Sequence, residues 1–381
     1  MKTTEYKDSE VGRIPADWEV ASLADIGEVK MCKRVLKEQT TENGEIPFYK
    51  ISTFGKKADA YIATNLYLNY KEKFSYPKRG DVLLSAAGTI GRTVIFDGAP
   101  SYFQDSNIVW LDNDERKVLN SFLYYVYKEI KWVTESGTIP RIYNGTVRSI
   151  KFAYPIDNNE QNAIANSLSS IDSLISSLDE LIEKKQLIKD GLMQELLSGK
   201  KRLRGFSGEW QSVRMEEIEI KNGSMLKSSE YEPGNVPVIA GGVSAAGYHS
   251  KANRPSNTIT ISGSGANAGF VNFFEEPIFA SDCSTINEQK SIYVKYLYYA
   301  LLFKQPEIYK CQAGGAQPHI HAKDIKDIVI PMPTLKDEQV AVASVLTEID
   351  KQIITIESQR DKYLLIKQGM MQQLLTGKTR L

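Results

Sequence analysis

Three short strings in the chain could do chemistry, and the first is the GKT of Gly377–Thr379. A phosphate-binding loop ends in such a string, but it also needs a glycine five residues before the GK, a preceding strand and a following helix. Gln372 occupies that glycine position, and the preceding segment has a helical pattern. We therefore interpret GKT as a helix terminus and not as a nucleotide site.

The second candidate is a pair of histidines, His319 and His321, which follow Cys311 and could bind a metal ion. At the matching positions in the first half of the chain stand Arg141 and Tyr143, so only one half has the histidines. No fourth ligand accompanies them. We expect no metal site here.

The third candidate is a pair of carboxylates, Asp105 and Asp282, each of which follows a strand-like run and could belong to a nuclease. No second acidic residue accompanies them at a matching position, which favours a structural role in capping a turn or a helix. The chain also lacks a nucleophile elbow, a GxGxxG after a strand, and an Asn/Asp-Pro-Pro-aromatic tetrad for methylating a base. We predict that the protein is not an enzyme.

The chain contains a long internal repeat. Residues 186–203 read QLIKDGLMQELLSGKKRL and residues 364–381 read LLIKQGMMQQLLTGKTRL, with twelve of eighteen positions identical. The same offset pairs the Glu-Gln of 160–161 with the Glu-Gln of 338–339. Two similar units usually close on each other around a pseudo-two-fold axis. The first copy continues into RGFSGEW, and the natural continuation of the second is the N-terminal VGRIPADW, so we expect the two chain ends to lie close together.

Each copy ends in a predicted long helix, the first over Glu160–Leu197, followed by Gly199 and Gly377 as expected at helix C-termini. Apolar residues recur at alternating steps of four and three, the pattern of a coiled coil, and Lys185 and Lys189 interrupt it. A helix with one apolar stripe needs a partner, so we predict that the two helices pack together. The apolar positions are Ile164, Leu168, Ile171, Ile175, Leu178 and Ile182 in the first helix, and Val342, Leu346, Ile349, Ile353 and Ile356 in the second.

The regions 14–155 and 206–332 predict α/β-type globular domains with a minority of helix. Short strand-like runs, such as DVLLSA, NIVWL and TITIS, are bounded by Gly, Pro, Asn and Asp. A predicted helix over Val118–Trp132 has its counterpart at Val294–Leu302. The strand order does not follow from this pattern.

Composition limits the class of protein. The 381 residues suggest two to four domains, and 42% hydrophobic with 25% charged residues is an ordinary globular balance. No apolar run is long enough to span a membrane, and the first ten residues lack the apolar core of a signal peptide. We predict a cytoplasmic protein without membrane partners. With 47 basic and 47 acidic side chains, any nucleic-acid binding must come from local patches or from a more basic partner.

One such patch lies between Lys30 and Arg79, where basic residues outnumber acidic ones by eleven to five and aromatic residues are interleaved. This composition suits a nucleic-acid surface, and a solvated basic face explains it equally well. The second copy is less basic here. Nearly identical tails beside dissimilar globular regions indicate one scaffold used twice for two different ligands.

Several features together resemble the specificity subunit of type I restriction–modification systems. They are the tails ending in LLSGKKRL and LLTGKTRL, the GFSGEW string that begins the second copy, the DVLLSAAGTIG run, and the NNEQ and KDEQ strings at the helix starts. The resemblance covers essentially the whole chain. It implies a mixed α/β (α+β) fold with two globular target recognition domains, separated by two long antiparallel coiled-coil helices in a pseudo-two-fold internal repeat. We place the recognition domains at residues 1–155 and 200–332, and the helices in residues 156–199 and 333–381.

The resemblance also implies a non-catalytic subunit. Each recognition domain would read one half of a split target in double-stranded DNA, and the helices would set the spacing and dock methyltransferase subunits. Restriction (translocase) subunits would complete the assembly. S-adenosylmethionine and ATP would be bound by those partners, so we expect no cofactor in this chain.

Candidate DNA contacts follow from side-chain chemistry, because Arg can bind guanine bidentately, Asn or Gln can bind adenine, and Lys mostly contacts phosphate. For each candidate, an ordinary surface role is the competing interpretation. The candidates are Lys33, Arg34, Lys56, Lys57, Arg92 and Arg141 in the first domain, and Lys227, Asn267, Gln317 and His319 in the second.

Two alternatives stay open. The same architecture could serve a methyltransferase–nuclease of another restriction class, of the type IIB or IIG kind. From a different functional class, the chain could be a two-headed protein-interaction scaffold that binds no DNA.

Overall fold

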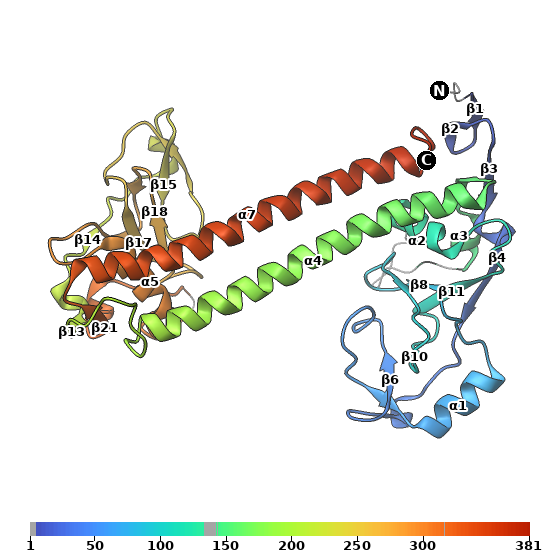
Figure 1. Ribbon diagram of the computed structural model, residues 1–381, viewed down its shortest axis with the longest axis horizontal. Helices are drawn as coiled ribbons and strands as arrows, with labels where there is room; N and C mark the ends of the chain where they lie inside the picture. Colours follow the sequence, from blue (N-terminus) through green and yellow to red (C-terminus); the bar gives the residue numbers. More distant parts are fainter. Residues whose placement is uncertain (1–4, 133–141, 143, 316) are drawn as a thin grey trace. The chain divides into compact units, whose positions relative to one another are not determined.

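The computed structural model describes residues 5–132, 142, 144–315 and 317–381. The chain forms two compact units, unit 1 (residues 1–177 and 360–381) and unit 2 (residues 178–359). Each unit combines one globular region with parts of two long helices, α4 (Asn158–Leu196) and α7 (Lys336–Leu374) (Figure 1). The prediction of mixed α/β regions with two long helices is confirmed. Within the described residues, no helix is apolar and long enough to cross a membrane.

The centre of unit 1 is a four-stranded antiparallel sheet, and a hydrophobic core covers each of its two faces. Side chains alternate between the faces, so that Leu83 and Trp110 join one core while Val82 and Leu111 join another with α2 (Asn120–Glu129). Burial on both faces explains the nearly continuous apolar runs of the sequence. In order across the sheet, the strands are β4 (Gly27–Met31), β11 (Ile108–Asn113), β8 (Val82–Ser85) and β9 (Thr93–Ile95).

Smaller elements surround this sheet. The second core, built around Phe48, Phe54 and Tyr102, lies between the main sheet and a second sheet. That second sheet consists of β10 (Tyr102–Phe103), β6 (Ile46–Tyr49), β7 (Tyr61–Ile62) and β5 (Thr40–Thr41), and α1 (Thr64–Lys73) follows β7. The remaining elements are the hairpin β1 (Tyr6–Ser9) and β2 (Gly12–Pro15), the pair β3 (Trp18–Ser22) and β12 (Lys151–Pro155), and α3 (Asn144–Ser149).

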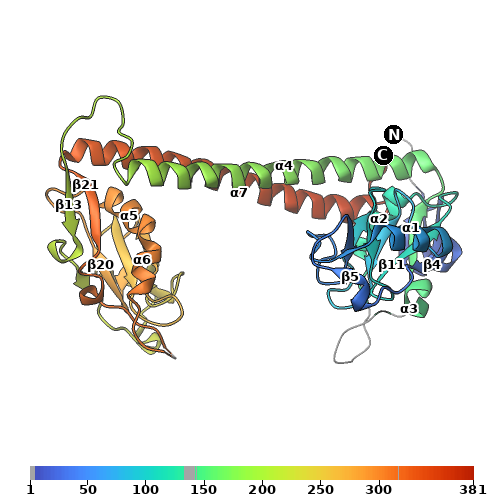
Figure 2. The same ribbon diagram turned by 90° about the horizontal axis from the view of Figure 1, so that it is seen from below.

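Among the described residues, unit 2 repeats the main sheet of unit 1 with equivalent strands in the same order, and its smaller sheet has three strands where that of unit 1 has four. Helices α5 (Val294–Phe303) and α6 (Gln305–Lys310) pack on its main sheet (Figure 2). That sheet has the order β14 (Lys221–Asn222), β20 (Cys283–Ile286), β17 (Thr258–Ser262) and β18 (Val271–Phe274). The smaller sheet has β16 (Gly247–His249), β15 (Val236–Ile239) and β19 (Phe279–Ala280), and β13 (Trp210–Arg214) pairs with β21 (Val329–Pro333). The internal repeat of the sequence is therefore a repeat of topology.

Within each unit, the segments of α4 and α7 run in opposite directions. In unit 1, Ile164 and Leu168 near the start of α4 share a core with Leu374 at the end of α7. In unit 2, Leu196 at the end of α4 shares a core with Leu346 near the start of α7. The apolar residues that recur at steps of four and three thus lie on the buried side of each helix. The antiparallel pairing that the family resemblance implies is present in both units.

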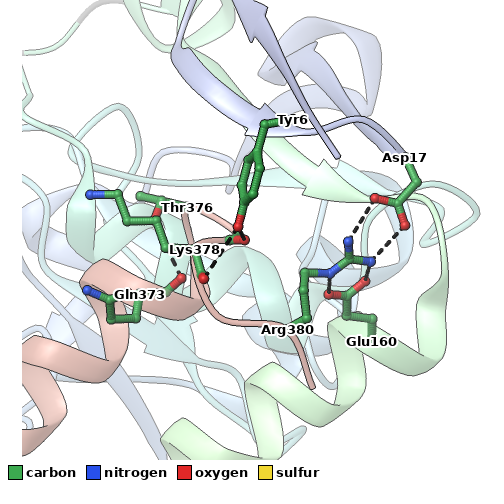
Figure 3. A network of polar contacts seen from close by, with 8 residues as sticks. Tyr6, Asp17, Glu160, Gln373, Thr376, Lys378 and Arg380 are labelled. Carbon is green, nitrogen blue, oxygen red and sulfur yellow. Dashed lines mark hydrogen bonds and ion pairs between the residues drawn. The ribbon is translucent and has the colours of Figure 1, made fainter. Parts of the chain in front are cut away.

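The C-terminal segment closes onto the N-terminal strands of unit 1 (Figure 3). The Tyr6 hydroxyl donates to the carbonyl of Gly377 at 3.2 Å, and the Arg380 guanidinium pairs with Glu160 and Asp17 at 2.5 and 2.7 Å. Gly377 adopts φ 68°, the left-handed conformation that ends a helix. In unit 2, the pair Arg202–Glu338 repeats the Arg380–Glu160 contact. The expectation that the two ends of the repeat meet is confirmed, and GKT is a helix terminus.

Candidate nucleic-acid interface

Four loops of unit 1 adjoin at one end of the main sheet. The backbone N–H of Ile51 donates to the Gln104 side chain at 2.9 Å, which joins the loop after β6 to the loop after β10. Gly88, in the turn after β8, lies against the Ile51 side chain. The loop after β4 reaches the same place, because Arg34 approaches Asp105 to 3.9 Å. Residues distant in sequence therefore form one continuous loop surface.

Lys33 and Arg34 lie in the loop after β4. The Lys33 ammonium sits 5.1 Å from the centre of the Phe74 ring, a cation–π contact that holds the side chain in place. The Arg34 side chain is 74% exposed, and its pairing with Asp105 is long, so its guanidinium is available to a ligand. Asp105 therefore faces a cation, and the capping role that the sequence favoured stays a prediction.

Arg92, Lys56 and Lys57 come together on the neighbouring part of this surface. The Arg92 guanidinium donates to the carbonyl of Phe54 at 2.8 Å and so supports the turn that carries the two exposed lysines. Lys56 also borders a hollow of about 360 Å³ whose lining includes Tyr49, Phe54 and Phe103. Arg141 lies outside the described residues.

Unit 2 brings the equivalent loops together by different bonds. The N–H of Gly265 donates to the carbonyl of Pro318 at 2.9 Å, and the Gln312 side chain donates to the carbonyl of Ala268 at 2.6 Å. The N–H of Leu226 donates to the Ser281 hydroxyl at 3.1 Å, which adds the loop after β14. The same end of the equivalent sheet thus carries the loop surface in both units.

Polar uncharged groups dominate this second surface. Lys227 and Gln317 are exposed, and Asn267 is half-buried in the turn after β17. His319 is held by paired backbone hydrogen bonds with Ala313, of 2.8 and 3.0 Å. The structure therefore places all four candidates of the second domain on loops of the shared surface, and of these four only Lys227 is a lysine or arginine.

Two buried cysteines, Cys32 directly after β4 and Cys283 at the start of β20, are not nucleophiles. Burial raises the pKa of the Cys32 thiol to about 12 and that of the Cys283 thiol to about 12. Both thiols therefore stay protonated at neutral pH. Within the described part of the chain, no three or more His, Cys, Asp or Glu side chains gather into a possible metal site.

The structure adds residues that the candidate set omits. Lys50 pairs with Asp59 at 2.9 Å near the turn of Lys56, and the Ser264 hydroxyl bonds to Asp282 in unit 2. Asp105 and Asp282 are repeat-equivalent residues of the two surfaces. Their matching positions in the repeat were visible in the sequence, although their side chains bond to different partners.

Comparison with known proteins identifies the architecture. The family described as "Type I restriction modification DNA specificity domain" matches residues 15–187 and 207–365. A type I restriction enzyme specificity subunit of Haemophilus influenzae is 53% identical over 181 residues, which is 47% of each chain. This chain therefore spans about half the length of that relative. A type I specificity subunit of Methanocaldococcus jannaschii is 25% identical over 417 residues, covering 100% of this chain and 97% of the other.

Solved structures show the same fold. A type I restriction–modification S subunit from M. genitalium superposes with a TM-score of 0.70 over 94% of this chain and 96% of that one, at 22% identity. A chain from a study of complex assembly and conformational transition in a type I system superposes with a TM-score of 0.54 at 16% identity, over 96% of this chain and 99% of that one.

Proposed function

Because the chain belongs to the family of type I restriction–modification DNA specificity proteins, and is a recognition subunit and not an enzyme, we propose that it reads a split target in double-stranded DNA. Each recognition domain, residues 1–155 and 200–332, reads one half of the target. One observation carries the proposal: equivalent loops gather at equivalent sheet ends in both units, yet carry different side chains. A shared frame with unlike contact residues is what two different half-sites require.

The two loop surfaces suit different recognition chemistry. In the first domain, Arg34 and Arg92 can address guanine while the lysines contact phosphate. In the second domain, Asn267 and Gln317 can address adenine through paired hydrogen bonds. Each half-site needs only three or four base pairs, since a mismatch costs about 1–3 kcal/mol. The full set of proposed contacts is Lys33, Arg34, Lys56, Lys57, Arg92, Arg141, Lys227, Asn267, Gln317 and His319.

The two helical segments, residues 156–199 and 333–381, are proposed to set the spacing of the half-sites. Each long helix has 39 residues, and at 1.5 Å per residue this is about 58 Å. One turn of B-DNA rises about 34 Å, so half-sites about one turn apart are within reach of such a helix. Zero net charge fits a subunit whose partners supply much of the phosphate contact.

Two equivalent apolar pairs on the helices are proposed to dock methyltransferase subunits. Leu187 and Leu365 occupy matching positions of the repeat and are 66% and 70% exposed, and Ile188 and Ile366 follow them at 42% and 40%. Packing within this chain does not explain why exposed leucines and isoleucines recur at matching positions. Two copies of one partner would explain it.

The remaining partners follow from the same proposal. Restriction (translocase) subunits complete the complex, and S-adenosylmethionine and ATP bind to the partner subunits. The subunit works in the cytoplasm, where its DNA target lies.

A methylome tests the proposal. The chain is co-expressed with the methyltransferase subunit of its restriction–modification system, and modified bases are mapped across the host chromosome. We expect one split motif with methylated adenine in each half. A continuous motif, or cleavage by the methyltransferase polypeptide itself, points to another restriction class. No methylated motif in a complex that assembles points to an interaction scaffold and contradicts DNA reading.

A further inference from the structure

In unit 1, a carboxylate, a tyrosine hydroxyl and a lysine meet between three helices. The Tyr125 hydroxyl of α2 donates to Asp172 of α4 at 3.0 Å, and Lys367 of α7 forms an ion pair with the same carboxylate. Lys128 of α2 adds a second cation at 3.9 Å. The Lys367 side chain is 17% exposed and that of Asp172 is 30% exposed. We call this group the Asp172 node.

Unit 2 contains the equivalent group, the Asp350 node. The Tyr299 hydroxyl of α5 donates to Asp350 of α7 at 2.7 Å, and Lys189 of α4 pairs with Asp350 at 2.6 Å. The side chains of Lys189 and Asp350 are 14% and 26% exposed. The Tyr299 oxygen also lies 3.2 Å from the Thr347 hydroxyl, which can donate to it. Leu302 occupies the position of Lys128, so this node has one cation.

The repeat relates the two nodes residue by residue. Asp172 and Asp350 match, as do Lys367 and Lys189, and Tyr125 and Tyr299 both lie in an LYY string. In each node the aspartate belongs to the helix that follows its own globular region, whereas the lysine comes from the other helix. Each node thus ties three elements together: a helix of the globular region and both long helices.

A polar group among the apolar residues between two packed helices can specify their register, that is, how far one helix is shifted along the other. Ile171 and Ile349, which precede the two aspartates, are both buried among these apolar residues, and Lys189 is one of the residues that interrupt the heptad pattern. If the helices shifted along each other, the apolar contacts could re-form at the next turn. The carboxylate would then lose its lysine, and a half-buried unpaired charge is costly.

We propose that the two nodes are positioning sites, which fix the register of α4 against α7 and the seating of each globular region on them. The inference rests on the proposed function, because the separation of the two half-sites then depends on this register. The nodes act through the helices and touch no DNA. Their loss therefore changes the spacing that the protein accepts while the bases that it recognises stay the same.

Methylation of a DNA library tests this inference. The full chain is assembled with its methyltransferase and offered the preferred half-sites at spacers from two base pairs shorter to two longer. Lys189→Met/Asp350→Leu removes the charge pair and leaves Tyr299 its bond to Thr347. We expect relative methylation at spacers one base pair from the preferred length to rise about fivefold, with unchanged half-sites. Lys189→Arg, which keeps the ion pair, retains the wild-type profile.

A matched control removes an ion pair that lies near the end of one helix. Lys201→Met/Glu195→Gln deletes the pair Lys201–Glu195, which is exposed and involves no second helix. Equal broadening by this control, or a wild-type profile for the assembled node variant, overturns the inference. If the node variant does not assemble, Tyr299→Phe decides, and an unchanged profile again overturns the inference. Wild-type protein that methylates no split target contradicts the proposed function instead.

Discussion

One buried glutamine connects each globular region to the start of its long helix. Gln161 is fully buried, and its side chain accepts from the N–H of Leu119 at 2.8 Å and donates to the carbonyl of Pro155 at 2.8 Å. Gln339 makes the same bonds with Tyr293 and Pro333, at 2.7 and 2.9 Å. The repeated Glu-Gln pair was visible in the sequence. Its role was not, since the partners are backbone groups that only the folded chain brings near.

Replacement of either glutamine is expected to destabilise its unit strongly. Gln161→Leu and Gln339→Leu each leave buried backbone groups without partners, at a cost of about 2–4 kcal/mol. Urea unfolding of the full chain measures the change. Gln372→Leu, at an exposed position of α7, is the control and should stay within about 0.5 kcal/mol of wild type. Losses of similar size for buried and exposed glutamines would contradict this role.

The closure of the C-terminal segment is expected to depend on pH. The hydrogen bond from Arg380 lowers the pKa of Asp17 below its ordinary 3.8. A lowered pKa stabilises the fold above pH 3.8, and this contribution is lost as the pH falls through the lower folded value. The Asp17 side chain is 64% exposed, so the effect is at most about 1 kcal/mol. In urea unfolding, the difference between wild type and Asp17→Asn should be constant near neutral pH and vanish once the pH falls below the lowered pKa of Asp17. A difference that persists there would exclude this ion pair as its source.

At the scale of elements, the long helices were the most predictable part. The helix predicted over Glu160–Leu197 is α4, Asn158–Leu196, because its apolar period is local and long. The lysines that interrupted the pattern are explained by partners on the other helix: Lys189 pairs with Asp350, and Lys185 donates to Gln352 at 2.8 Å. The sequence pattern alone could not show these partners, since they lie far away along the chain.

The exposed leucines of the helices provide an element-scale prediction. Leu187→Asp with Leu365→Asp should abolish binding of the methyltransferase subunits, because each substitution places an unpaired charge in a proposed apolar interface. Mass photometry of the purified mixture measures the stoichiometry. Leu68→Asp is the matched control, since Leu68 is 57% exposed on α1, away from the long helices. Normal assembly by the double variant would rule out these pairs as the docking sites.

At the scale of the whole molecule, the internal duplication could be predicted from the sequence, and the assembly of loops into one surface could not. Strand-like runs predicted β8, β11 and β17. Their order could not be predicted, because β10 pairs with β6 across more than fifty residues and such pairing depends on tertiary packing. The candidate contacts on the loop surfaces rested on residue type, and their roles in DNA binding stay predictions.

The most direct test of modular recognition is an exchange of one domain. Residues 14–155 are replaced by the corresponding region of a homologous specificity subunit, and the methylome of the resulting complex is mapped with the same methyltransferase. We expect one half-site to change while the other half-site and the spacer stay as in the wild type. A complex that assembles and methylates a target altered in both halves, or in neither, would contradict the account.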